Sequence, residues 1–404
     1  MDCEYPLDPN QADKRNMRQK KEKYGMGKRE AWNTILVFCI LTFGFTVATI
    51  IKPSDDFSET ENRSLAQMPK LTGKNILDGT FESDYESYLT DQFILRDAWI
   101  GLKTDVERLA MKKESKDIYF ADDDYLIEKH TGSFTTTQAE RNIQSLAQFF
   151  DMYQDTFPKG HRSVLLIPNA VDILRDKLPP FAAPYDEEDY LAKAKATLAD
   201  DLWVDAGSVL RQHTDTQLYY RTDHHWTTEA AFYVYQNWAA AQKLPVRDAD
   251  HYEIRTVTDA FEGTIQSKLG IHTVTDSIDL YLAEGDPFYT VQKNGSEEVD
   301  YSIYDYSALD TKDKYAVFFG GNQALVKIST RAKADRRFLV IQDSYAHCFL
   351  PFLFEDASEI DVVDLRYYNQ KLSDLIAEGN YTDVLFLYNV AGFAEDTSLA
   401  KLLG

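Results

Sequence analysis

One run of 18 residues, at positions 34–51, contains no charged side chain and ends at Lys52 and Pro53. Such a run is close to the minimum length of a helix that crosses the hydrocarbon core of a bilayer. The apolar core of a cleaved signal peptide usually has roughly 7–15 residues, and no small-x-small cleavage site follows before Lys52. A cleaved signal peptide and a buried core helix are the alternatives. We therefore predict a transmembrane signal anchor over residues 32–52.

The charges around this run predict how the chain crosses the membrane. Residues 1–30 hold eight basic and six acidic side chains, whereas the whole chain holds 43 basic and 66 acidic ones, a net charge of −23. Basic residues beside a span usually stay in the cytoplasm, so we expect a cytoplasmic tail at residues 1–31 and an extracytoplasmic remainder. The negative net charge disfavours nucleic acid as a partner. Cys3, Cys39 and Cys348 would lie in three different compartments, which excludes an intrachain disulfide framework and fits a bacterial cell membrane.

Beyond the apolar run the sequence changes character twice. Residues 53–116 begin as a polar linker and continue with apolar side chains at helical spacing, which predicts juxtamembrane helices. In residues 117–404, short apolar, β-rich runs alternate with helical patterns, which is typical of an α/β domain with a mainly parallel sheet buried on both faces. The expected strands are 163–168, 217–220, 315–319, 337–341, 360–364 and 382–388, and the expected helices are 137–155, 187–200, 228–243 and 370–378.

Two segments carry residues suited to chemistry. Ser344 follows a predicted buried strand, so its hydroxyl is expected at a strand-to-loop corner. A serine hydroxyl needs a base to remove its proton as it attacks, and a neutral imidazole can act in that way. The sequence Asp223-His224-His225 supplies an imidazole on His225 and a carboxylate on Asp223 that could hold the ring in one tautomer. His224 is expected to point away, because neighbouring side chains alternate in an extended loop.

The same residues allow two other interpretations. Asp223, His224 and His225 could bind a metal, but the spacing is not that of a helical zinc motif and no cysteine lies nearby. Alternatively, Asp223 could cap the following helix while His225 is a half-buried polar residue. We expect neither a metal nor an organic cofactor.

The sequence also resembles a known family. Residues 222–227, Thr-Asp-His-His-Trp-Thr, are similar to the signature that names the DHHW family of bacterial surface proteins. That family in turn resembles alginate O-acetyltransferases of the SGNH-hydrolase-like class, in which an Asp-x-His pair precedes the nucleophilic serine. Here His225 precedes Ser344 by 119 residues, which matches this permuted order. Further similarity lies at residues 57–65, 91–96, 118–127, 320–322 and 388–389.

The resemblance implies a permuted SGNH hydrolase-like (flavodoxin-like) catalytic domain over residues 117–404, with a mainly parallel sheet flanked by helices. It implies Ser344 as nucleophile, His225 as base and Asp223 as the residue that orients the base. For the oxyanion, the backbone amide of Ser344 or Tyr345 is the first candidate donor.

Other residues could assist at the same site. The segment containing Gly320, Gly321 and Asn322 could supply a second donor to the oxyanion, or it could be a plain turn after a strand. Arg366 could bind a sugar hydroxyl or carboxylate, or it could form a surface salt bridge. We interpret His347 and Cys348 as packing residues.

Such a site would support acyl transfer through an acyl-serine intermediate. The resemblance favours O-acetylation of a cell-surface polysaccharide, with a multi-pass membrane acyltransferase of the MBOAT type as a partner that carries acetyl groups across the membrane. Two alternatives are a carbohydrate esterase that removes the same group and a non-catalytic subunit that binds or assembles the polysaccharide.

Overall fold

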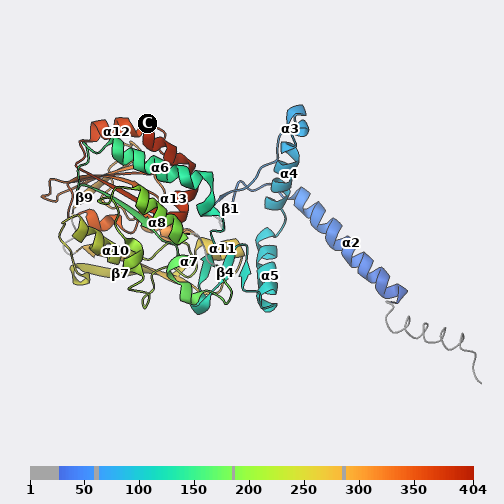
Figure 1. Cartoon of the computed structure of the whole chain (residues 1–404). Coiled ribbons are helices and arrows are strands. Elements are labelled where there is room, and N and C mark those ends of the chain that lie inside the picture. Colours follow the sequence, from blue (N-terminus) through green and yellow to red (C-terminus); the bar gives the residue numbers. More distant parts are fainter. Residues whose placement is uncertain (1–26, 59–62, 184–186, 284–287) are drawn as a thin grey trace, which may run out of the picture. The chain divides into compact units, whose positions relative to one another are not determined.

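The computed structural model of the chain describes residues 27–58, 63–183, 187–283 and 288–404 (Figure 1). The chain divides into two compact units. Of the described residues, the first comprises 27–58 and 63–96, and the second comprises those from 97 to 404. Of the basic tail expected at residues 1–31, only residues 27–31 lie within the described part of the chain.

The first unit contains the predicted apolar run within helix α2 (Lys28–Ile51). This helix has 24 residues, so it is about 36 Å long, enough to cross a hydrocarbon core of about 30 Å. It is long and apolar enough to span a membrane, and none of its residues is buried. Within the same unit, the guanidinium of Arg63 donates two hydrogen bonds, of 2.6 and 2.9 Å, to the carboxylate of Asp91. The other elements of this unit are β1 (Phe57–Ser58), β2 (Arg63–Ser64), α3 (Gly73–Leu77) and α4 (Thr80–Asp91).

The second unit is built on a six-stranded sheet, and the predicted α/β class with a mainly parallel sheet is confirmed. The first four strands in spatial order are parallel, and the last two are antiparallel to their neighbours. In spatial order the strands are β6 (Arg162–Ile167), β13 (Asp383–Asn389), β11 (Arg337–Gln342), β12 (Glu359–Val363), β10 (Leu325–Thr330) and β9 (Tyr289–Lys293).

Hydrophobic cores on both faces explain why the parallel strands have continuous apolar sequences. In β13, Leu385 and Leu387 join one buried cluster, whereas Phe386 and Tyr388 join the other. One face is covered by α6 (Thr137–Met152), α8 (Glu187–Thr197), α12 (Leu372–Gly379) and α13 (Val390–Glu395). The opposite face is covered by α10 (Thr228–Ala241) and the hairpin of β7 (Tyr252–Phe261) and β8 (Asp276–Ala283) (Figure 1).

The remaining elements connect and border these layers. Helix α5 (Arg96–Leu109) approaches the end of α11 (Thr264–Leu269) closely, because a Cβ atom on Gly101 would lie 2.2 Å from the carbonyl oxygen of Gly270. The Thr104 hydroxyl donates to the carbonyl of Leu269 at 2.7 Å in the same contact. These elements are α5 (Arg96–Leu109), β3 (Glu114–Ser115), β4 (Ile118–Phe120), β5 (Leu126–Glu128), α7 (Ala170–Ile173), α9 (Ala206–Leu210) and α11 (Thr264–Leu269).

Two of the expected strands are wrong. Residues 217–220 form a loop with an isolated bridge between Tyr219 and Trp226, and their apolar side chains are buried without a neighbouring strand ladder. Residues 315–319 overlap a short 3-10 helix, Lys314–Val317, followed by Phe319 at φ +63° and Gly320 at φ +69°. Left-handed residues turn the chain, so an apolar pentapeptide at this position cannot continue as a strand.

The sequence patterns also missed β9, β10 and the β7–β8 hairpin. In β10 buried and exposed positions alternate, and β7 is exposed along most of its length. These strands have polar residues on one face, so they lack the continuous apolar runs that identified the central strands.

Candidate active site

Ser344 lies immediately beyond the end of the central strand β11. It opens a short 3-10 helix, Ser344–Ala346, and Asp343 is the residue before it. The carboxylate of Asp343 accepts a hydrogen bond from the Tyr345 amide at 3.0 Å and another from the Asn389 amide at 2.9 Å. Asp343 therefore fixes the Ser344 turn to the end of the neighbouring strand β13.

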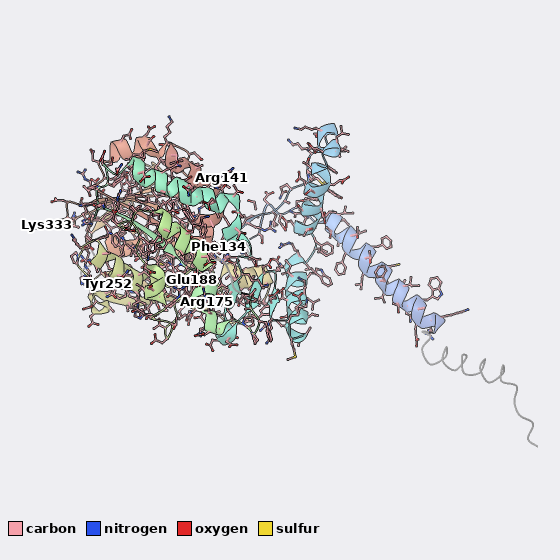
Figure 2. The ribbon with its side chains drawn as sticks, viewed as in Figure 1. Phe134, Arg141, Arg175, Glu188, Tyr252 and Lys333 are labelled. Carbon is pink, nitrogen blue, oxygen red and sulfur yellow. The ribbon has the colours of Figure 1, made fainter. Side chains whose placement is uncertain are left out.

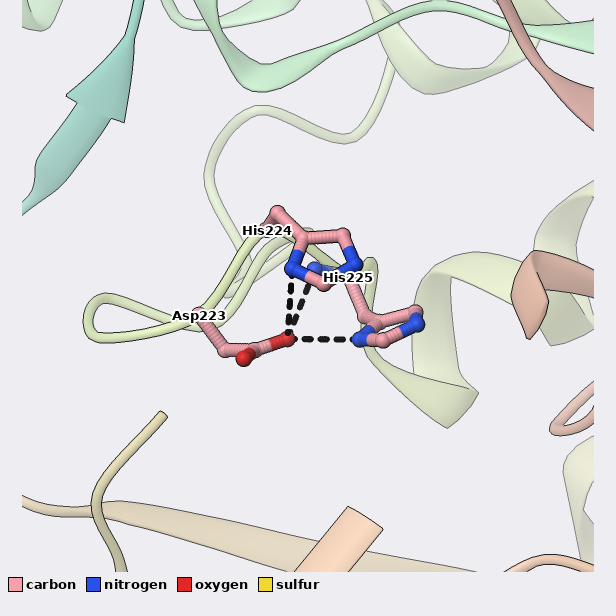
Figure 3. A group of neighbouring side chains, drawn as sticks. All are labelled: Asp223, His224 and His225. Carbon is pink, nitrogen blue, oxygen red and sulfur yellow. Dashed lines mark hydrogen bonds and ion pairs between the residues drawn. The ribbon is translucent and has the colours of Figure 1, made fainter. Parts of the chain in front are cut away.

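The structure brings Asp223 and His225 to this turn. Both lie in a loop closed by the bridge between Tyr219 and Trp226, just before α10. The Nδ1 atom of His225 lies 2.6 Å from Asp223 Oδ1, and its Nε2 atom lies 2.8 Å from the hydroxyl oxygen of Ser344. When Nδ1 carries the proton, it donates to Asp223, and Nε2 is free to accept the proton of Ser344. Figure 3 shows the Asp223 carboxylate beside both histidines.

The carboxylate of Asp223 is buried and saturated with donors. Oδ1 accepts from the His225 amide at 3.0 Å as well as from its ring, and Oδ2 accepts from the Thr264 amide at 2.8 Å and the Thr264 hydroxyl at 2.9 Å. Burial alone would raise the pKa of Asp223. The neighbouring His224 and His225 rings and these hydrogen bonds outweigh burial and hold the pKa well below its usual range.

His224 does not point away as expected. Its ring centroid lies 4.0 Å from that of His225, and its Nδ1 lies 2.9 Å from the Thr264 hydroxyl oxygen, which in turn donates to Asp223. The Tyr345 hydroxyl donates to the backbone carbonyl of His224. The expectation fails because residues 221–225 form a series of bends, in which side chains do not alternate as they do in an extended strand.

Aromatic rings hold the His225 imidazole in place. The Tyr315 ring stacks on the His225 imidazole, with centroids 3.8 Å apart and planes 14° from parallel, and its hydroxyl donates to the Ser344 carbonyl at 3.2 Å. Trp226, next to His225, donates its indole N–H to the carbonyl of Tyr345 at 2.8 Å. Sequence reasoning missed Tyr315 and Thr264, which belong to distant segments and carry no motif of their own.

Burial lowers the pKa of His225 to about 4. The neighbouring His224 contributes to this lowering of the pKa, while Asp223 opposes it. The imidazole is therefore neutral at neutral pH, which is the form that a general base requires.

We expect kcat/KM for a small acetyl ester to rise with an apparent pKa of about 4, well below the 6.5 of an ordinary histidine. The variant His224→Gln should move this acid limb to higher pH, because the charge of the neighbouring ring is removed. Initial rates from pH 3.5 to 8, in protein shown to stay folded over that range, measure both. An acid limb near pH 6.5 in the wild type would contradict the assignment of the buried ring as the base.

The two candidate amide donors at Ser344 differ in their environment. The Tyr345 amide is occupied by the carboxylate of Asp343, so it could serve an oxyanion only if that bond broke. The Ser344 amide has no hydrogen-bond partner among the described residues. The geometry thus favours Ser344 over Tyr345 as the backbone donor.

Gly321 and Asn322 lie in the turn after the 3-10 helix Lys314–Val317. Gly321 has φ +84°, and the Asn322 side chain donates to the Tyr367 hydroxyl at 3.4 Å. Within the described part of the chain, neither residue has a hydrogen bond to Ser344 or His225. The hydrogen bonds of the described residues therefore do not join Gly321 or Asn322 to the serine and the histidine.

Arg366 follows β12 and forms an ion pair. Its Nη2 lies 2.6 Å from Oδ2 of Asp364, a carboxylate that is completely buried. Burial raises the pKa of Asp343 to about 7, and the charge of Arg366 opposes this rise, so the guanidinium contributes to the field at the Ser344 turn. His347 and Cys348, the two residues interpreted as packing, are both buried.

A chain of buried polar residues leads from Asp343 to α8. Asn389 donates its side-chain N–H to Asn169 Oδ1 at 2.5 Å, and Asn169 donates its backbone and side-chain N–H groups to the carboxylate of Glu187, at 2.7 and 3.0 Å. Burial raises the pKa of Glu187 to about 8, and the bonds from Asn169 oppose this rise. These contacts connect the ends of β6, β13 and β11.

We expect Glu187→Leu to lower the free energy of unfolding by about 1–3 kcal/mol, because the Asn169 donors would then face no acceptor in the buried interior. Denaturant unfolding of the soluble part of the chain measures this difference. Glu188→Leu is the matched control, since that neighbouring side chain is 64% exposed and pairs with Arg175 at 3.0 Å on the surface (Figure 2). Equal stability of both variants would contradict the role of the buried network.

The residues of the alternative metal interpretation do lie together. Ligand atoms of Asp223, His224 and His225 are all within 4.8 Å of one another. However, each oxygen of Asp223 already accepts two hydrogen bonds, and Nδ1 of His225 is bonded to it. A cation would have to replace these donors, so the arrangement fits a hydrogen-bonded pair of aspartate and histidine better than a metal ligand set.

The fold and site together describe an α/β protein with a serine, a histidine and an aspartate at the carboxyl ends of its parallel strands. Residues 201–363 match the family model described as DHHW protein, and this segment contains all three residues. The resemblance predicted from the sequence is thereby confirmed. No curated protein sequence matches the chain.

Solved structures share the fold. A DHHW family protein from Eubacterium siraeum DSM 15702 has 22% sequence identity and a TM-score of 0.56, over 71% of this chain and 95% of that chain. Bacillus cereus PatB1 with a sulfonyl adduct has 22% identity and a TM-score of 0.57, over 70% of this chain and 97% of that chain. The O-acetyltransferase domain of Pseudomonas putida AlgJ is more distant, with 12% identity and a TM-score of 0.41, and supports no inference.

Proposed function

We propose that the chain is an extracytoplasmic O-acetyltransferase that acts on a cell-surface polysaccharide through an acyl-serine intermediate. Ser344 is the nucleophile, His225 the general base and Asp223 the residue that orients the base. The observation that carries the proposal is the 2.8 Å separation between Ser344 Oγ and His225 Nε2, with Asp223 bonded to the other ring nitrogen. The acetyl group and the polysaccharide acceptor come from the family resemblance.

In the acylation step, Ser344 Oγ attacks the carbonyl carbon of an acetyl ester or thioester donor, and its proton passes to His225 Nε2. Ionised Asp223 stabilises the imidazolium that forms, and the Ser344 amide donates to the negative oxygen of the tetrahedral intermediate. As the intermediate collapses, the bond to the leaving group breaks, and the leaving group takes the proton from His225.

In the second step, a hydroxyl of the glycan attacks the acetyl-serine and gives its proton to His225. Collapse of the second tetrahedral intermediate breaks the bond to Ser344 Oγ, and His225 returns the proton to that oxygen. Water in place of the glycan hydroxyl would make the same site an esterase. A permuted SGNH fold accounts for the chain order, in which the Asp223–His225 pair precedes Ser344.

The membrane anchor and the partner belong to the same proposal. Helix α2 would hold the catalytic domain outside the cell, where it receives acetyl groups carried across the membrane by a multi-pass acyltransferase of the MBOAT type. We expect protease added to intact cells to digest the chain beyond residue 53 and to spare an epitope in the tail, whereas permeabilised cells should lose both. Protection of the C-terminal domain in intact cells would reverse the proposed topology.

A covalent probe tests the nucleophile. We expect an alkyl sulfonyl fluoride to label Ser344 in the full-length protein, detected as a mass increase on its peptide, and labelling should fall when His225 is replaced. The sulfonyl adduct named for Bacillus cereus PatB1 supports this choice of reagent. Acetyl transfer from p-nitrophenyl acetate to a glycan, compared with release of free acetate, then separates transferase from esterase. A protein that resists the reagent and turns over no ester would instead support a non-catalytic binding subunit.

A further inference from the structure

A cavity of about 690 Å³ lies beside the start of the β7–β8 hairpin, in the same unit as the site. It is formed by the first residues of β7, the last residues of β8, the start of β9 and the segment after β9. Tyr252, labelled in Figure 2, marks the end of β7 that borders it. The aromatic residues of its lining are Tyr252, Tyr289, Tyr301, Tyr304 and Tyr306.

The exposure of two of these tyrosines indicates a binding surface. Tyr301 is 68% and Tyr306 47% exposed, although tyrosine rings bury a large apolar area when they pack. A ring that is open on one face can pack against the C–H groups of a sugar, while its hydroxyl bonds to sugar hydroxyls. Ser302 adds another hydroxyl to the same lining.

The charges of the lining favour a neutral ligand. Among the described residues that border the cavity, the cation is Arg255, and its guanidinium is already bound by Glu253 at 2.7 Å. The carboxylate of Asp250 adds a second negative charge to the lining, beside that of Glu253. An anionic sugar would therefore meet a net negative lining, in a protein whose overall charge is also negative.

A series of ring contacts connects the cavity to the base. Successive centroid separations are 6.1 Å from Tyr304 to Phe318, 5.1 Å from Phe318 to Tyr315 and 3.8 Å from Tyr315 to His225. The Tyr304 ring therefore lies no more than about 15 Å from the imidazole. Because Phe318 and Tyr315 are buried, this separation runs through the core, and a glycan that joins the two places must pass over the surface.

We propose that this tyrosine cavity binds a neutral stretch of the acceptor glycan, a few sugar units along the polymer from the hydroxyl that is acetylated. The proposal rests on the proposed transferase function and names where the substrate is held. The cavity would contribute to the affinity for polymer, while the chemistry remains at Ser344.

Two single variants of the full-length protein, Tyr301→Ala and Tyr306→Ala, test the cavity. Both side chains are exposed, so neither change should disturb folding. The probes are cellohexaose and chitohexaose, as neutral hexasaccharides, and a hexaguluronate of equal length.

We expect a neutral hexasaccharide to bind in calorimetry, and each variant to weaken that binding about tenfold. The ratio of acetyl transfer onto that hexasaccharide to turnover of a small acetyl ester should fall by a similar factor. Phe181→Ala, another fully exposed aromatic that is not part of this cavity, should match the wild type in both assays.

The outcomes separate the two proposals. Binding of a neutral hexasaccharide that depends on Tyr301 and Tyr306, without any acetyl transfer, would leave the cavity as a glycan site and contradict the transferase. If both variants bound the hexasaccharide as the wild type does and acetyl transfer persisted, the glycan-binding role of the cavity would be wrong and the transferase function would stand. Tighter binding of hexaguluronate than of either neutral hexasaccharide would contradict the assignment of a neutral ligand.

Discussion

Ser344→Ala is expected to lower acetyl-ester turnover by on the order of a thousandfold or more, because no acyl-enzyme can form without its hydroxyl. His225→Ala should cost about as much, since the serine would lose the base that lies 2.8 Å away. Asp223→Ala should cost somewhat less, because the imidazole could still accept a proton in some of its orientations. Initial rates with p-nitrophenyl acetate measure all three.

The combination of the first two changes is the sharper test. Residues that act as a unit are strongly non-additive, so the double variant should be about as slow as either single variant. Ser329→Ala, an exposed serine on β10, is the matched control and should keep the wild-type rate. Thermal unfolding of each variant establishes that the domain stays folded. If Ser344→Ala transferred acetyl groups to glycan at the wild-type rate, the nucleophilic mechanism would be wrong, and the binding-subunit alternative would become the better explanation.

Gly263→Ala is expected to lower kcat/KM for the same ester by on the order of a hundredfold or more. A Cβ atom at this position would lie 2.2 Å from the Cβ of Asp223 and 2.6 Å from the carbonyl oxygen of Thr222, so the backbone must shift. Such a shift would break the two bonds from Thr264 to Asp223 and misplace the base. A misplacement of about 1 Å can cost on the order of a hundredfold in rate.

Three companion variants identify the cause of this loss. Gly73→Ala is the matched control, because a Cβ atom there meets nothing within 4 Å and its backbone lies outside the left-handed region. Thr264→Val removes the hydroxyl without moving the glycine, whereas Thr264→Ser keeps it, so the first should be slow and the second close to wild type. A Gly263→Ala protein with full activity and unchanged thermal stability would show that the close approach to Asp223 is not required.

The sequence predicted those features that depend on residues close together along the chain. No charge interrupts the run at residues 34–51, and a segment that crosses a membrane must satisfy its backbone groups internally, so the sequence predicts a helix there. The central strands were recognisable because burial on both faces makes their sequences continuously apolar. The pairing of Asp223 with His225 was also local, since the two residues are only two positions apart.

Sequence patterns failed where burial is one-sided or where the backbone turns. The exposed positions of β7 and β10 interrupt an apolar run, so these strands were missed. Residues 315–319 are apolar yet not a strand, because the left-handed residues that follow direct the chain into a turn and place Tyr315 over His225. A short apolar segment does not distinguish these outcomes by its composition.

By itself the sequence determined the apolar helix, the α/β class and the identity of the residues that we propose for acyl transfer. Only the tertiary structure decided that Ser344 meets His225 across 119 residues, that Thr264 reaches Asp223 across 41, and that Gly263 must leave room for that contact. The reason is physical: hydropathy periodicity reports which face of an element is buried, whereas the distance between two loops is set by the order of the strands and the packing of the layers that carry them.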